Sequence, residues 1–376
     1  MDYLEESYEE DLEEIEEDIE AVDLEKKYDR AQKELVTQTV DFNVRNLADM
    51  VTNKQIDTSP KYQRRLRWDN VRKSKLIESI LMNVPIPPLF FAEEKYGKYA
   101  VIDGQQRLRA LSEFFTNMLE LDGLEVFKEL NGKRFAEIPI ELQSILNMRP
   151  TLRCIIILRQ SDPQIKFEVF ERLNTGGVHL NPQEIRNSAY RGPLNDLIID
   201  LSESTMFREM LKIKSPNKSK IVQQMRDCEL ILRFFAIKDS WENFRGRHKD
   251  LLNNFMMENQ ELDDEALETL KLNFTNTLEL VRVCFGENAF RRYNPGQENW
   301  ATQVLASLFD AQMIACYELN IKKEVLLKKQ ENIIEAFKNV FSDDEFLYSI
   351  GSGTNQKSKI VYRVNKIKEL IINEVQ

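Results

Sequence analysis

The feature that most constrains the fold is a predicted strand that runs directly into a glycine and then into a predicted helix. Residues 99–102 are β-prone and alternate in polarity, which is typical of a short strand. Leu108, Leu111, Phe114 and Phe115 then recur at helical spacing. We therefore expect a strand–turn–helix unit at the centre of the first domain.

The junction between that strand and helix consists of Asp103, Gly104, Gln105, Gln106 and Arg107. The glycine allows a tight turn, and the first N–H groups of the new helix would form an anion site. The glutamines offer amide groups, and the arginine offers a fork that matches phosphate. The aspartate could hold a hydrated metal ion, orient the arginine or cap the helix. A capped helix start with a surface arginine is the simpler alternative.

The segment 56–68 combines cations with aromatic rings, a composition that suits phosphate binding with base stacking. The alternative is an arginine-rich loop held in place by a buried tryptophan. The cations are Arg64, Arg65 and Arg67, and the aromatic residues are Tyr62 and Trp68.

A second glycine-containing segment, Asn174-Thr175-Gly176-Gly177, follows a predicted helix that ends at Leu173. Paired glycines commonly stop a helix. They also make backbone N–H groups available to a phosphate or a base. Both interpretations remain open at this point.

From residue 193 onward the pattern is almost wholly helical, which predicts an all-α domain. We expect helices over 193–213, 219–238, 242–258, 263–285, 299–319 and 323–341. The domains would then be an acidic helix over 1–35, an α/β domain over 36–192 and a helical domain over 193–376. Lysines in two segments of the last domain are either solvated or in contact with the DNA backbone: Lys218, Lys220, Lys357 and Lys359.

The net charge of −11 hides an uneven distribution of charge along the chain. Residues 1–25 contain 14 Asp and Glu and no Lys or Arg, which leaves a remainder that is slightly basic. A low overall isoelectric point therefore does not exclude a nucleic-acid partner. The apolar stripe of this segment predicts a helix that packs on the body, pairs with a second copy of the chain or occupies a basic groove.

Composition excludes several other classes of protein. Two histidines are too few for a histidine-rich zinc site or a His-Asn-His nuclease centre. Four widely separated cysteines predict free thiols, and no apolar run is long enough to span a membrane. We expect a cytoplasmic protein with no membrane partner.

Several motifs, taken in order, resemble the N-terminal domain family of GmrSD-type modification-dependent restriction systems, which is related to the ParB/sulfiredoxin fold. The motifs are Tyr62-Gln63-Arg64, Trp68, residues 76–81 with Pro85-Ile86-Pro87, Asp103-Gly104-Gln105-Gln106-Arg107 and residues 170–177. The resemblance implies an α/β nucleotide-handling domain in prokaryotic DNA restriction or anti-phage defence. Longer members append a His-Asn-His nuclease domain, which two histidines cannot supply, so we expect a separate nuclease or effector partner.

The resulting hypothesis is an NTPase domain, using GTP or ATP with Mg²⁺, followed by a helical domain that senses or contacts DNA. Asp103, Gln105, Gln106 and Arg107 are the predicted catalytic residues, and Asp103 is the predicted metal ligand. The predicted nucleotide-binding residues are Gln63, Arg64, Gly104, Asn174, Thr175, Gly176 and Gly177. The predicted DNA contacts are Arg65, Arg67, Lys218, Lys220, Lys357 and Lys359. The alternatives are a DNA-binding adaptor without turnover and a metal-dependent DNA nickase.

Overall fold

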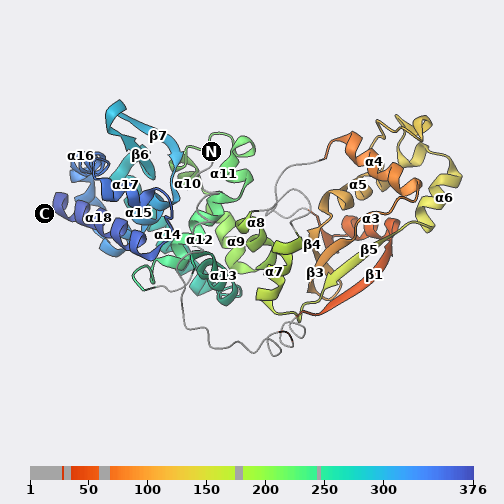
Figure 1. Cartoon of the computed structure of the whole chain (residues 1–376), viewed down its shortest axis with the longest axis horizontal. Coiled ribbons are helices and arrows are strands. Elements are labelled where there is room, and N and C mark those ends of the chain that lie inside the picture. The colour runs from red at the N-terminus through yellow and green to blue at the C-terminus, as the bar shows by residue number, and fades with distance from the viewer. Residues whose placement is uncertain (1–27, 29–34, 59–67, 174–180, 244–246) are drawn as a thin grey trace. The chain divides into compact units, whose positions relative to one another are not determined.

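The computed structural model describes residue 28 and residues 35–58, 68–173, 181–243 and 247–376. They belong to two compact units, of which one ends at Ala189 and the other runs from Tyr190 to Gln376 (Figure 1). The first unit combines a sheet with helices, and the second is mostly helical. The predicted mixed α/β class followed by a helical region is thus confirmed.

A five-stranded mixed sheet forms the centre of the first unit, in the order β1-β5-β3-β4-β2. The central strand β3 pairs in parallel with β5 and antiparallel with β4, and β3 and β4 form a hairpin that turns at Gly97. β5 has buried side chains at Leu152, Cys154, Ile156 and Ile157, as its apolar sequence predicts. The strands are β1 (Thr37–Asn43), β2 (Ile56–Asp57), β3 (Leu89–Lys95), β4 (Lys98–Asp103) and β5 (Thr151–Ile157).

Three helices lie together on one side of this sheet: α3 (Val44–Thr52), α4 (Asn70–Leu81) and α5 (Gln105–Phe115) (Figure 1). Their apolar faces meet the sheet in one core, and Leu108 and Leu111 of α5 are fully buried there. Asp69 caps α4 through a hydrogen bond from the backbone N–H of Arg72, as its position in the sequence predicts. Helices α6 (Ile140–Met148), α7 (Pro163–Leu173) and α8 (Pro182–Ala189) complete the unit.

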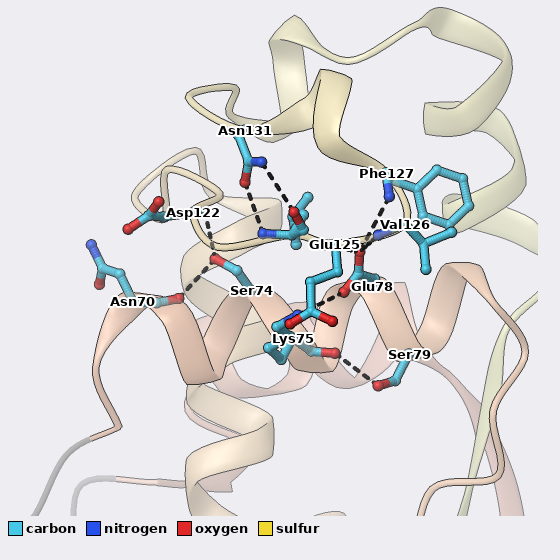
Figure 2. Close-up of polar contacts among 11 residues, drawn as sticks. Asn70, Ser74, Lys75, Glu78, Ser79, Asp122, Glu125, Val126, Phe127 and Asn131 are labelled. Carbon is cyan, nitrogen blue, oxygen red and sulfur yellow. Dashed lines mark hydrogen bonds and ion pairs between the residues drawn. The ribbon is translucent and has the colours of Figure 1, made fainter.

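A buried carboxylate fastens the loop after α5 to α4 (Figure 2). Glu78 accepts hydrogen bonds from the backbone N–H groups of Glu125, Val126 and Phe127, at 2.8, 2.7 and 3.2 Å. Lys75 forms an ion pair with the same carboxylate at 3.3 Å. Burial alone would raise the pKa of Glu78, but the three N–H donors and Lys75 lower it below its ordinary value. The loop is therefore held by a charged group that needs to stay ionised.

The second unit contains the helices α9 (Pro193–Ser202), α10 (Thr205–Met210), α11 (Lys220–Gln223), α12 (Arg226–Ile237), α13 (His248–Glu258), α14 (Asp264–Phe285), α15 (Ala306–Leu319), α16 (Lys323–Val340), α17 (Asp344–Ile350) and α18 (Lys357–Val375). The long helices predicted at 193–213 and 219–238 are each divided in two. Met225 interrupts the latter with φ of +53°, a left-handed conformation that a helix interior does not allow. Among the described helices, none is both long and apolar enough to cross a membrane.

The helix predicted over 299–319 was wrong in its first part. Residues Asn299–Val304 form strand β7, which pairs antiparallel with β6 (Arg291–Asn294). Trp300 on β7 packs against Tyr293 across the hairpin and stacks on Phe337 of α16, with ring centroids 5.1 and 5.7 Å apart. The aromatic packing across the hairpin and against α16 therefore stabilises a strand at Asn299–Val304, although the sequence of this segment also permits a helix.

Candidate functional site at the strand–helix junction

Gly104 makes the turn between β4 and α5 in a conformation that favours glycine. Its φ is +100°, and an added Cβ would lie 2.2 Å from Cδ2 of Leu89 on the neighbouring strand. Leu89 is fully buried, so it has little room to move away. The glycine thus allows α5 to start directly against the sheet.

The Arg107 guanidinium is held in one orientation from two sides. Its Nη2 donates to Asp103 Oδ2 at 2.8 Å, one helical turn earlier. Its Nη1 donates to the carbonyl oxygen of Pro87 and, at 3.4 Å, to that of Pro88. The side chain of Arg107 is 12% exposed, whereas that of Asp103 is 53% exposed. Burial lowers the pKa of Arg107 and the Asp103 carboxylate opposes that effect, so the arginine remains a cation fixed beside the helix start.

Both glutamines of the junction bind backbone groups of the segment 56–68. Gln105 Nε2 donates to the carbonyl oxygen of Thr58 at 2.7 Å, and Gln106 Oε1 accepts from the backbone N–H of Trp68 at 3.2 Å. Arg109 also donates to the Thr58 carbonyl, from Nε at 2.9 Å and from Nη2 at 2.6 Å. Thr58 and Trp68 are thus both bound to the first turns of α5. Sequence reasoning missed Arg109, although it is a second arginine two residues after the motif.

The start of α5 carries the features of an anion site. No side chain of the described residues caps this helix, because Asp103 pairs with Arg107 instead of accepting from the first-turn N–H groups. Uncapped N–H groups at a helix N-terminus attract a phosphate. Within the described parts of the chain, no three His, Cys, Asp or Glu side chains gather as metal ligands. The junction could hold Mg²⁺ in the way the ion is bound together with nucleotides. One carboxylate, water molecules and the phosphates of the substrate then supply the ligands.

Several predicted site residues lie outside the described residues: Gln63, Arg64, Arg65, Arg67, Asn174, Thr175, Gly176 and Gly177. The structure brings Asp103, Gly104, Gln105, Gln106 and Arg107 together at one junction. For Gln63, Arg64, Arg65 and Arg67 it places the two ends of their segment at that junction, at Thr58 and Trp68.

The four predicted DNA-contact lysines of the helical unit differ in their surroundings. Lys218, Lys220 and Lys357 are exposed. Lys359 is buried: its Nζ donates to the Ser352 carbonyl oxygen at 2.6 Å and lies 3.9 Å from the centroid of the Tyr348 ring. The charge of Lys359 thus holds the loop before α18, while the other three lysines present theirs to solvent.

The polar loop over 349–356 is organised within the second unit by buried arginines. Arg363 donates to the carbonyl oxygens of Ser349 and Thr354, and Arg233 donates to Asn355 Oδ1 at 3.1 Å. Both arginines pair with Asp310, whose side chain is fully buried. These contacts account for the polar composition of the loop.

The fold and the junction together define an α/β domain followed by a helical unit. In the α/β domain, a helix start that no described side chain caps lies beside a fixed arginine. In the comparison with protein families, residues 47–191 match "GmrSD restriction endonuclease, N-terminal domain". This match confirms the predicted resemblance over residues 47–191 and supports a place for the chain in a GmrSD-type restriction or defence system. The comparisons with curated proteins and with solved structures returned no match.

Proposed function

We propose that the chain is a nucleoside-triphosphate-binding and NTP-hydrolysing component of a restriction system, and that its helical unit contacts DNA. The observation that carries the proposal is the start of α5, which no side chain of the described residues caps. This start follows a left-handed glycine and lies beside the fixed cation of Arg107. Phosphoryl transfer needs mainly positioned positive charge and N–H donors, so the scarcity of histidine is no obstacle.

In this mechanism the backbone N–H groups after Gly104 bind phosphate oxygens, and Arg107 stabilises the charge of the transferring phosphoryl group. Asp103 is half exposed and lies 2.8 Å from the arginine, so it is placed to orient a water molecule or to bind Mg²⁺ through water. Gln105, Gln106 and Arg109 bind the backbone of Thr58 and Trp68. We expect Arg64, from the sequence between these two residues, to add a further charge to the phosphates. GTP and ATP are the expected substrates.

The test is phosphate release from GTP, ATP and CTP with Mg²⁺, with and without DNA. Asp103→Asn keeps the size of the side chain and removes its charge, and we expect it to lower turnover at least tenfold while the fold is retained. Arg153→Ala is the control, because Arg153 on β5 forms an exposed ion pair with Asp41 on the edge strand β1 of the same unit, at 3.1 Å. Equal turnover in wild type and Asp103→Asn would contradict the proposed role of the carboxylate.

One observation favours a second candidate, a DNA-binding adaptor that binds without turnover. The amide groups of Gln105 and Gln106 already hold backbone groups of neighbouring segments. Side chains occupied in this way organise a surface without needing to react. DNA binding that weakens steeply with salt, together with no phosphate release from any nucleotide, would support this candidate.

A further inference from the structure

A cavity of about 830 Å³ lies in the second unit, well apart in sequence from the junction at Asp103. Its lining comes from α10 and the turn that follows, the end of α14 and the start of α16. The apolar part of the lining consists of Met206, Met210, Ile213, Val283 and Leu327. This volume is within the range of small-molecule sites, which are mostly apolar with a few placed polar groups.

The remaining side chains of this cavity give it an excess of positive charge. The charged residues of the lining are Arg208, Lys212, Lys214, Arg282, Lys323, Glu209, Glu279 and Glu287, five cations against three acids. Four of these charges cancel within two ion pairs: Arg282 lies 3.7 Å from Glu209, and Lys323 contacts Glu279. Among the described residues, Lys212 donates to an amide oxygen, that of Asn288 at 3.4 Å, and to no acidic side chain. Lys214 contacts no acidic side chain among the residues that the structure describes.

A buried cation lies directly behind the cavity wall. Arg291 is 0% exposed, and its Nη1 donates to the carbonyl oxygens of Met210 at 2.9 Å and Glu287 at 3.4 Å, both from residues that line the cavity. Its Nε and Nη2 have no hydrogen-bond partner in the described structure, and none of the ion pairs there includes it. Arg208, on the lining itself, has a buried Nε without a partner among the described residues, while its Nη2 pairs with Glu203 at 3.5 Å. Of these two arginines, Arg291 is therefore the one without a counter-charge. A buried guanidinium without a counter-charge is costly, so this wall favours an anion.

We propose that this cavity binds a small phosphorylated ligand with an apolar body, of the size of a mononucleotide. Lys212 and Lys214 would contact the phosphate, and the field of Arg291 would stabilise its charge through the wall. The methionines and Leu327 would pack against the body of the ligand, as flexible thioethers suit irregular ligand surfaces. This site is separate from the proposed NTP site, and its existence does not depend on hydrolysis there.

The experiment is isothermal titration of the full chain with AMP and GMP, with adenosine and guanosine as phosphate-free counterparts. Lys214→Glu should weaken binding of the monophosphates by about tenfold or more, since it replaces an attraction with a repulsion. Lys271→Glu is the matched control, because Lys271 is an exposed lysine of α14 that does not line the cavity. Leu327→Trp, at a half-exposed position, should block the cavity without disturbing the core.

The proposed ligand site in the cavity would be supported if monophosphate binding weakens in Lys214→Glu and Leu327→Trp. The binding should persist in Lys271→Glu and in Arg107→Ala. Three results would overturn it: no monophosphate binds, Lys271→Glu weakens binding as much as Lys214→Glu does, or Arg107→Ala abolishes binding. The last result would assign the ligand to the junction in the first unit, so failure here is distinct from failure of the proposed NTP site.

Discussion

Replacing Gly104 with alanine tests the physical basis of the candidate site. The left-handed φ of +100° costs an alanine about 1 to 2 kcal/mol. The new Cβ would also lie 2.2 Å from Leu89 Cδ2, and over-packing of a well-packed core adds about 1 to 3 kcal/mol. We therefore expect Gly104→Ala to destabilise the first unit by about 2 to 5 kcal/mol.

Two comparisons separate these contributions. Gly97 has φ of +72°, and a Cβ added there would have no atom within 4 Å, so Gly97→Ala should show only the conformational cost, about 1 to 2 kcal/mol. Leu89→Val removes the Cδ atoms, so Gly104→Ala should cost only about 1 to 2 kcal/mol in that background. Urea unfolding gives the free energies, and hydrogen exchange of residues 89–115 assigns them to the junction. If Gly104→Ala costs no more than Gly97→Ala, the reasoning about Leu89 is refuted.

Three further predictions concern charged groups. Glu78→Gln should destabilise the first unit by about 1 to 3 kcal/mol at pH 7. The pKa of Glu78 is lowered in the folded state, so the stability difference between wild type and Glu78→Gln should vanish as the pH falls through that pKa. Urea titrations at several pH values would detect this loss. Burial raises the pKa of Asp227 to about 6, so the second unit should lose stability as the pH rises from about 4 to 6, and Asp227→Asn should remove that decline in thermal unfolding curves. Asp310→Asn removes the buried carboxylate that pairs with both Arg233 and Arg363 and should cost about 3 to 5 kcal/mol in urea unfolding. A loss under about 1 kcal/mol would contradict that account.

Local patterns predicted the central sheet and junction well because those elements follow strong short-range signals. The strand predicted at 99–102, the turn at Gly104 and the helix through Leu108, Leu111, Phe114 and Phe115 all appear in the structure. The β6–β7 hairpin was missed because Trp300 is stabilised by Phe337, which is distant in sequence. Pairing between distant segments leaves no periodic trace in the sequence.

The same limit applies to the roles of the site side chains. The sequence places Gln105 and Gln106 beside a glycine and a helix start, and from there a ligand contact is the natural expectation. The structure shows that the two amides bind the backbone of Thr58 and Trp68, a tertiary contact that spacing cannot reveal. Lys359 likewise belongs by sequence to an exposed polar loop, yet its contact with Ser352 buries it.

The most direct test of the central claim is the equilibrium binding of GTP and ATP, with Mg²⁺, to wild type and to Arg107→Ala. Arg107→Lys, which keeps the charge and loses the fork, and circular dichroism of each variant separate a lost contact from a lost fold. The account predicts that wild type binds a triphosphate and that folded Arg107→Ala binds it at least tenfold more weakly. Equal affinity in wild type and Arg107→Ala, or no binding of either nucleotide to wild type, would contradict a nucleotide site at this junction.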